Sequence, residues 1–548
     1  MSAQSPEEGE SEKPTSQPSI LTRSFHTVQL LWRFKHFLPT VAFTSFNYYL
    51  PLNLFPRYHD SWSFSTALFV SLTQFSSKTS KIQRIKEGEL DIVEQVQKQR
   101  KRLENLIVNP KDLPPKNGTI LEVEFKVKKR GLKGILKSLD DQEEEKGDRI
   151  LKAEWSAHDS LFTTTTTNDN NNKQGKVLLY FHGGAYCYMS PKTHRPLCLK
   201  LSKTLNCPVF SVDYRLSPET KFPGNLHDAV SSYLYLTQDL GIPSHKILIG
   251  GDSAGGNLST ALLLYLKDHP TSSSRSILPR GGILFSPWLD LTSSFKSWDS
   301  NKFTDYISLD STTSSSNSKD QEDPLNPSRL FVEFEKDLIH PYVSPSISSS
   351  SNLRGLPPLL VFAGGSETLR DEISIFCEKV YRSSQINDDI RYEIFEGGIH
   401  VFMAIMENSL GKKSLERIRE WDKELDEKVE GKSRRREEGV ELEEEIEGPL
   451  IMREVLKKLK EKWEKKPPRP STTTGRKAEE EDRFIFEEFL EPAPKVELRE
   501  FAHPLAVKAV QELSESFSNT KNQGFTRIIR ARKNPNFKPK NFWARLHL

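Results

Sequence analysis

One serine stands between glycines where two apolar segments of different character meet. Residues 250–257 read GGDSAGGN, after the strand-like HKILI and before the helix-like LSTALLLYL. Gly251 and Gly255 frame Ser253 in the pattern G-x-S-x-G. A strand that turns sharply into a helix crowds its side chains, and glycine relieves the crowding because it has no Cβ. Such a turn raises the serine hydroxyl above the edge of a sheet, where it is placed as a nucleophile; a plain strand-to-helix turn is the alternative.

Strand-like and helical segments alternate on both sides of this turn. The apolar strand candidates are KVLLYFHG, CPVFSVDY, KILIGGD, GGILFSP, PLLVFAG and RYEIFEG. Continuous apolar strands separated by helices predict a mostly parallel sheet that helices cover on both faces. Two segments with strand alternation, 119–129 and 149–158, precede them. The sequence therefore predicts an α/β fold in which the ends of several strands share one edge.

Composition divides the chain of 548 residues into a core and polar extensions. Hydrophobic residues make up 35% and charged residues 28%, which is low and high for a globular enzyme. Low-complexity loops are expected near 163–172 and 311–323. The expected parts are a disordered start (1–19), an apolar segment (20–80), the α/β domain (81–428) and a charged, partly disordered extension with a basic end (429–548).

The apolar segment contains two stretches that could meet a membrane. Residues 37–56 carry no charge and are long enough to span a bilayer, but three prolines make them a poor regular helix. Residues 61–77 form a better helix that is rather short. A membrane span, an interfacial or lid-forming segment and a buried helix all fit. The polar, acidic start is unlike a signal peptide, so we expect an intracellular protein, at the endoplasmic reticulum membrane or in the cytoplasm.

Charge and cysteine spacing constrain the partners only weakly. The net charge of +3 excludes no class of partner. After Glu515 the chain has basic and aromatic residues and no acidic ones, which fits an anionic membrane, nucleic acid or a solvated tail. We expect the solvated tail and no specific nucleic-acid partner. The four cysteines show neither metal-ligand spacing nor a disulfide framework, as in a reducing compartment.

A second glycine turn supplies candidate oxyanion donors. The segment LLYFHGGAYCYMS ends a strand in His182-Gly183-Gly184-Ala185. Acyl transfer places negative charge on the substrate carbonyl oxygen, and backbone N–H groups of a loop with small side chains can approach that oxygen. We expect the N–H groups of Gly184, Ala185 and Ala254 to bind it and Gly183 to shape the loop. A tight glycine turn without this role is the alternative.

The base and the acid of a catalytic triad have candidates later in the chain. His400 follows a strand and a Gly-Gly turn, which puts it at the same sheet edge as Ser253. The acid should lie between the two in sequence. Glu367 directly follows a strand and has the right place, whereas Asp371 and Glu372 belong to the next helix. We predict Glu367 as the acid and keep Asp371 as the alternative.

Together these motifs resemble the hormone-sensitive-lipase-like branch of the α/β-hydrolases (the α/β-hydrolase fold-3 family), which includes arylacetamide deacetylases and fungal steryl acetyl hydrolases. The resemblance implies a cap from N-terminal helices and a late insertion, here within 20–80 and 291–350. Two residues depart from the family pattern: Ala185 replaces the third glycine of HGGG, and Glu367 stands where aspartate is common. The matching segments, in family order over roughly 175–425, are YFHGGAY, SVDYRLSPE, FPGNLHDAV, GGDSAGGNLS, FSPWLDL, LPPLLVFAGGSETLRDE and GGIHVF.

The resemblance and the candidate triad imply a serine hydrolase that cleaves carboxylic esters through an acyl-enzyme intermediate, without metal or organic cofactor. The apolar residues 37–77 suggest an ester of a hydrophobic alcohol or lipid, such as an acetylated sterol, met at a membrane surface through residues 20–80. A soluble, broad-specificity carboxylesterase and a non-catalytic binding or scaffold protein on the same fold are the alternatives. The sequence leaves the oligomeric state open.

Overall fold

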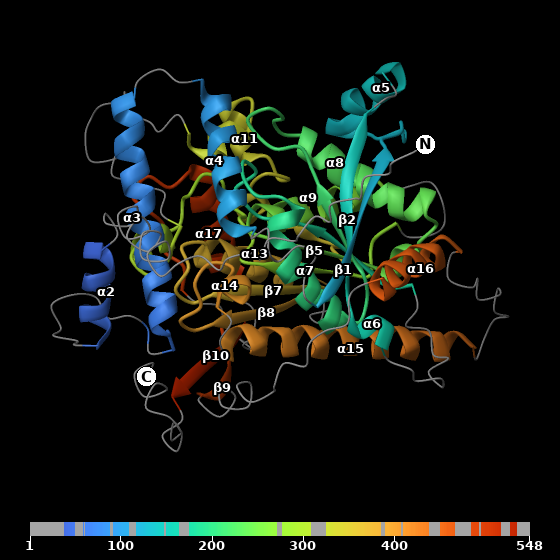
Figure 1. The fold of residues 1–548 in the computed structure, drawn as a ribbon. Helices are drawn as coiled ribbons and strands as arrows, with labels where there is room; N and C mark the ends of the chain where they lie inside the picture. Colours follow the sequence, from blue (N-terminus) through green and yellow to red (C-terminus); the bar gives the residue numbers. More distant parts are fainter. Residues whose placement is uncertain are drawn as a thin grey trace, which may run out of the picture.

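A ten-stranded sheet runs through the centre of the protein, with helices on both sides (Figure 1). Its strand order is β1-β2-β4-β3-β5-β6-β7-β8-β10-β9. The computed structural model describes residues 38–49, 59, 61–87, 91–108, 117–146, 149–163, 175–270, 277–307, 325–384, 390–406, 409–437, 450–465, 484–492, 495–516 and 526–533. The expected disordered start and both low-complexity loops, apart from Thr163, lie outside these residues.

The six apolar segments form neighbouring parallel strands, as predicted. Their register is continuous from β4 through β3, β5, β6 and β7 to β8. The two earlier segments form β1 (Gly118–Lys126) and β2 (Ile150–His158), which pair antiparallel with each other, and β2 also pairs antiparallel with β4. The parallel strands are β3 (Val177–Phe181), β4 (Val209–Asp213), β5 (Ile247–Asp252), β6 (Gly281–Phe285), β7 (Leu359–Gly364) and β8 (Ile390–Phe395).

Helices bury both faces of the sheet. Successive side chains of each strand point to opposite faces, so each strand contributes to both cores. Leu179 and Phe181 of β3 belong to the core on one face. Leu178 and Tyr180 belong to the core on the other face. Helices α8 (Gly224–Leu234), α9 (Ala254–Asp268) and α13 (Arg370–Ser383) pack on the first face, and α7 (Pro191–Leu205) and α15 (Ser409–Glu437) on the second. The remaining helices of this region are α5 (Lys137–Lys146), α6 (Ser160–Thr163), α12 (Ser350–Leu353) and α14 (Phe402–Ile405).

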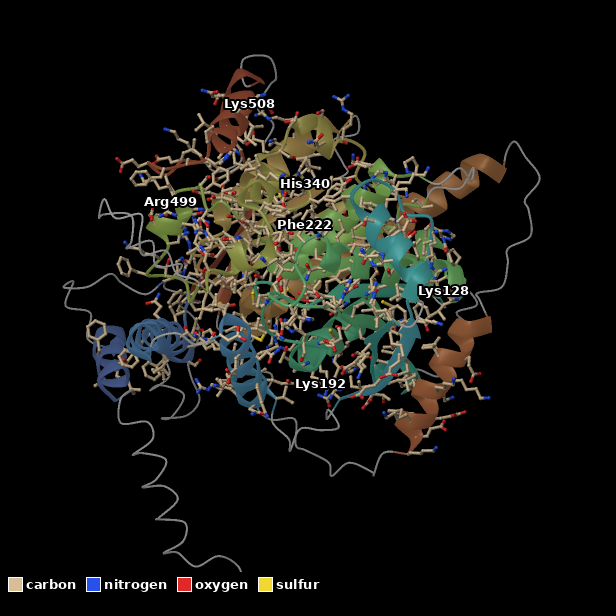
Figure 2. The ribbon with its side chains drawn as sticks, turned by 90° about the horizontal axis from the view of Figure 1, so that it is seen from above. Lys128, Lys192, Phe222, His340, Arg499 and Lys508 are labelled. Carbon is tan, nitrogen blue, oxygen red and sulfur yellow. The ribbon has the colours of Figure 1, made fainter. Side chains whose placement is uncertain are left out.

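The late insertion covers the first face of the sheet near its centre. It contains α10 (Ser297–Ser300) and α11 (Pro327–Phe331). The N–H of Phe222 donates to the carbonyl of Phe331 at 2.8 Å, and the ring of Phe222 lies 5.3 Å from that of His340. Seen from above, Phe222 and His340 lie in the middle of the molecule, away from Lys128 and Lys192 (Figure 2).

Two N-terminal helices, α3 (Phe64–Glu87) and α4 (Ile92–Ile107), lie against this insertion, as expected for a cap. Helix α2 (Leu38–Tyr49) packs on α3. Gln74 of α3 donates to the carbonyl of Asp305 at 2.6 Å, and the ring of Phe69 lies 5.3 Å from that of Tyr306. Trp62 donates to the carbonyl of Gly397 at 2.5 Å. Within the described residues, no helix combines the length and the apolar character that crossing a bilayer requires.

The predicted domain boundary at residue 428 is wrong, because later residues complete the sheet. β10 (Thr526–Lys533) pairs parallel with β8 and antiparallel with β9 (Phe484–Glu491). Ile529 of β10 is fully buried in the core beside Phe395. Helix α16 (Leu450–Glu464) packs on β1, and α17 (Pro504–Ser516) packs on α13. The open edge of β8 needs hydrogen-bond partners, and β10 provides them.

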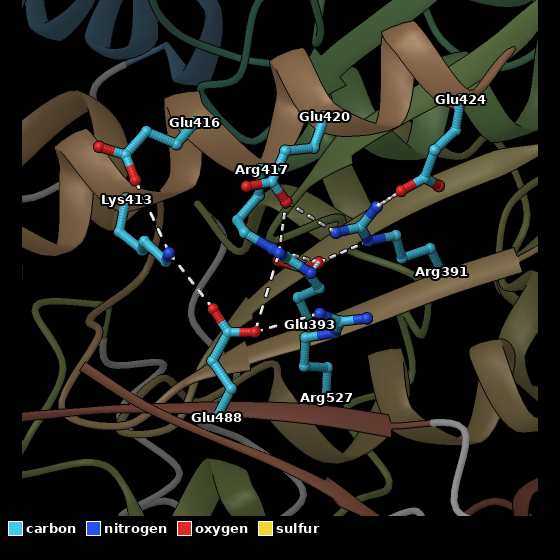
Figure 3. Close-up of polar contacts among 9 residues, drawn as sticks. All are labelled: Arg391, Glu393, Lys413, Glu416, Arg417, Glu420, Glu424, Glu488 and Arg527. Carbon is cyan, nitrogen blue, oxygen red and sulfur yellow. Dashed lines mark hydrogen bonds and ion pairs between the residues drawn. The ribbon is translucent and has the colours of Figure 1, made fainter. Parts of the chain in front are cut away.

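An ion-pair network connects β9 to the rest of the sheet (Figure 3). Glu393 of β8 is fully buried and accepts from Arg417 Nε of α15 at 2.9 Å. Glu488 of β9 lies 3.2 Å from Lys413 Nζ and 3.1 Å from Arg527. A buried carboxylate is stable only when cations and hydrogen bonds compensate its lost hydration. The network therefore ties strand β9 to helix α15 and, through it, to β8.

We expect Arg417→Ala to lower the free energy of unfolding by about 3 kcal/mol, because it removes a buried partner of Glu393. Arg419→Ala, on the exposed side of the same helix, is the matched control and should change stability by less than about 0.5 kcal/mol. Urea unfolding measures both. Equal stability of the two variants would contradict the structural role given to this network.

Candidate active site

The turn between β5 and α9 holds Ser253 in a strained conformation. Its φ of 53° and ψ of −121° lie in a region that residues with a Cβ rarely adopt. A Cβ on Gly255 would lie 2.0 Å from the carbonyl oxygen of Phe181, and one on Gly251 would lie 2.3 Å from the carbonyl oxygen of Gly255. Both glycines are therefore required for the close packing of strand and helix. The sharp turn predicted from G-x-S-x-G is present.

The loop after β3 and the first residue of α9 present backbone N–H groups without acceptors among the described residues. Gly184 has a φ of 110° and Ala185 a φ of 53°, so the chain doubles back here. Among the described residues, the N–H groups of Gly184, Ala185 and Ala254 have no hydrogen-bond acceptor. The N–H of Gly183 instead donates to Asp252 Oδ1 at 3.1 Å. Gly183 thus shapes the loop, and the other three residues supply the candidate oxyanion donors.

The predicted base and acid lie together in the interior. His400 Nδ1 is 3.2 Å from Glu367 Oε2, with side chains only 2% and 0% exposed. Glu367 Oε1 accepts from the N–H of Gly364 at 3.1 Å. Burial raises the pKa of Glu367, although the hydrogen bond from His400 opposes the shift. The carboxylate is fixed at both oxygens and orients the imidazole through Nδ1.

Asp371, the alternative acid, lies elsewhere. Its carboxylate accepts from Arg370 at 2.8 Å and from the N–H of Ser297 at 3.1 Å. Glu372 accepts from the N–H groups of Leu289 and Asp290. Both acids occupy the first turn of α13, and their backbone donors are residues 289–297 rather than the histidine. Glu367 precedes that helix and is the carboxylate at His400.

Ser253, the third member of the predicted triad, lies at the same sheet edge but is not hydrogen-bonded to His400 among the described residues. In the described part of the chain, no hydrogen bond joins Ser253 Oγ to His400. Catalytic hydrogen bonds are often long in unliganded enzymes and tighten when substrate binds. The structure therefore brings Glu367 and His400 together, and the transfer of a proton from serine to histidine stays a prediction.

A second buried carboxylate, Asp305, supports the histidine and was not predicted. Its Oδ1 accepts from the N–H of His400 at 3.0 Å, and its Oδ2 accepts from the N–H of Thr368 at 2.9 Å. Burial raises the pKa of Asp305. The neighbouring Tyr306 places its ring 5.8 Å from that of His400. Asp305 belongs to the late insertion, 95 residues before the histidine, and no local sequence pattern marks it.

Comparison with known proteins agrees with this geometry. Residues 178–404 match the alpha/beta hydrolase fold family. An acetyl-hydrolase of Streptomyces hygroscopicus is 34% identical over 36% of this chain and 59% of its own length. An esterase of Acinetobacter venetianus is 32% identical over 40% of this chain and 66% of its own length. Neutral cholesterol ester hydrolase 1 of Rattus norvegicus is 24% identical over 41% of this chain and 66% of its own length.

These alignments cover less than two thirds of the length of each of the three relatives. Among solved structures, an esterase from the bacterial hormone-sensitive lipase family aligns with 67% of this chain and 99% of its own, with 23% identity and a TM-score of 0.46.

Proposed function

We propose that the chain is a serine hydrolase that cleaves carboxylic esters, and the match of residues 178–404 to the alpha/beta hydrolase fold family supports this. The observation that carries the proposal is the buried pair of Glu367 and His400 at the sheet edge where Ser253 occupies its strained turn. The names of the bacterial relatives, an acetyl-hydrolase and an esterase, support the same reaction class.

In the proposed mechanism, His400 accepts the proton of Ser253 as the serine oxygen attacks the acyl carbon. The N–H groups of Gly184, Ala185 and Ala254 stabilise the oxyanion. The imidazolium then gives its proton to the leaving alcohol, which yields the acyl-enzyme. Water, deprotonated by the same imidazole, attacks the acyl carbon and releases the acid. Glu367 holds the imidazole in the required tautomer and stabilises its charged form.

A fluorophosphonate probe tests whether a serine is activated, and peptide mapping tests which one. We expect covalent labelling of the peptide that contains Ser253 in the wild-type protein and loss of that label after heat denaturation. Labelling of another serine, or none in the folded protein, would contradict the proposal.

For the substrate, we propose an ester of a hydrophobic alcohol or lipid, such as an acetylated sterol, at the surface of an intracellular membrane. Two observations support this: α3 packs through Phe69 against Tyr306, next to His400, and one relative is named a neutral cholesterol ester hydrolase. We expect a higher kcat/KM for steryl acetate in vesicles than for ethyl acetate, an ester of a small and equally unactivated alcohol, and flotation of the protein with those vesicles. Activity restricted to small soluble esters would instead favour a broad-specificity carboxylesterase.

A further inference from the structure

Asp252, the residue before the candidate nucleophile, holds the beginning of the oxyanion loop. Its Oδ1 accepts from the N–H of Gly183 at 3.1 Å and from Tyr180 OH at 2.5 Å. A Cβ on Gly183 would lie 2.2 Å from Asp252 Oδ2, so the loop lies directly on the carboxylate. Asp252 is only 4% exposed. A buried carboxylate in this position needs a compensating positive charge.

His194 of α7 provides that charge. Its Nε2 lies 3.4 Å from Asp252 Oδ2. Its Nδ1 lies 2.9 Å from Thr193 Oγ1, which donates its own hydrogen to the carbonyl of Ser190, and 3.3 Å from that same carbonyl. The Asp252 carboxylate and the Ser190 carbonyl can only accept, so a hydrogen on each ring nitrogen, as in the imidazolium, satisfies both contacts.

The surrounding groups agree with this charge state. Burial disfavours the charge, but Asp252 together with the carbonyl of Ser190 outweighs burial and raises the pKa of His194 above its ordinary value. Burial likewise disfavours the charge of Asp252, but His194 together with the hydroxyl of Tyr180 and the ring of His182 outweighs burial and keeps the pKa of Asp252 low. The nearby ring of His182, 5.6 Å away, stays neutral because burial lowers its pKa to about 3. Burial raises the pKa of Tyr180, so it also stays neutral, and Arg100 is a more distant cation that further disfavours the charge of His182.

We propose that His194 is a positioning residue for the oxyanion loop. Its charge keeps Asp252 ionised and oriented, Asp252 fixes the N–H of Gly183, and the next two N–H groups are thereby held toward the reacting carbonyl. The inference rests on the proposed function and adds a residue outside the triad. Alignment of oxyanion donors affects the transition state more than the bound substrate, so the effect should appear in kcat rather than in KM.

The charge pair also predicts a pH dependence with a defined sign. Because the pKa of His194 is raised in the folded protein, its contribution is complete below the ordinary value of 6.5 and is lost as the pH rises through the raised value. Because the pKa of Asp252 is lowered, its contribution is present above the ordinary value of 3.8 and is lost as the pH falls through the lowered value. We therefore expect a decline of kcat at alkaline pH that depends on His194.

Two substitutions separate the hydrogen bond from the charge. His194→Leu removes both, and we expect kcat for p-nitrophenyl acetate to fall about tenfold with KM nearly unchanged. His194→Gln keeps a donor for Asp252 but carries no charge, so at every pH it should show the lower kcat that the wild type reaches at alkaline pH, without an alkaline decline of its own. Lys192→Ala, exposed on the same helix, is the control (Figure 2). Rates are referred to active sites titrated with fluorophosphonate, so that misfolded protein is not counted.

An unchanged kcat in His194→Leu, a change in KM alone, or the same alkaline decline in His194→Gln as in the wild type would overturn the inference. Hydrogen exchange of the peptide around Gly183 provides a readout that does not need activity. We expect faster exchange there in His194→Leu and wild-type exchange in Lys192→Ala. A wild-type protein that neither turns over ester nor reacts with the probe would refute the proposed function, and exchange that is equal in all variants would refute the role of His194.

Discussion

Ser253→Ala is expected to lower kcat for p-nitrophenyl acetate by about 10⁶-fold. The substitution removes the oxygen that would form the acyl-enzyme. Alanine also has a Cβ, so the unusual backbone at this position changes little. The melting temperature should therefore remain close to that of the wild type.

The matched control for this experiment is Ser232→Ala. Ser232 is fully buried, and its hydroxyl donates to the carbonyl of Asp228 at 2.7 Å within α8, away from the sheet edge. We expect this variant to keep kcat within about threefold, with a loss of stability of about 1 kcal/mol. If Ser253→Ala and the wild type turned over ester at the same rate, a non-catalytic binding protein on this fold would become the better description.

Glu367→Gln is expected to lower kcat by about 10⁴-fold while KM changes little. The neutral amide cannot stabilise the imidazolium that forms when the serine loses its proton. The amide nitrogen also favours the wrong tautomer, because it donates to His400 Nδ1 where the carboxylate accepts. Glu367→Asp should recover part of the activity, since it restores the charge on a shorter side chain.

Asp371→Asn is the control that decides between the two candidate acids. Its carboxylate pairs with Arg370 and does not reach His400, so we expect a change in kcat of less than about tenfold. Stability is measured on both variants, because both carboxylates are buried. A large loss of kcat in Asp371→Asn together with near-normal activity of Glu367→Gln would assign the acid to Asp371.

Much of this architecture follows from local sequence signals. The strands beside Ser253 were predictable because each is a short apolar run between turn residues, and the glycines around it were informative because a Cβ at Gly255 has no room. The same reasoning located His400 and the loop at Gly184, since each follows a strand at the sheet's carboxyl edge. These features are set by backbone conformation within a few residues, and a single sequence contains that information.

The sequence by itself determined the succession of strands along the chain, the turn at Ser253 and the position of His400 after a strand and a Gly-Gly turn. The tertiary structure decided which acid meets His400, because this depends on where α13 begins and on the direction of each side chain. It also decided that Asp305 supports the histidine, that His194 reaches Asp252, and that β9 and β10 complete the sheet. Each of these contacts joins residues separated by tens to more than a hundred positions, and only the packed chain brings such partners within hydrogen-bonding distance.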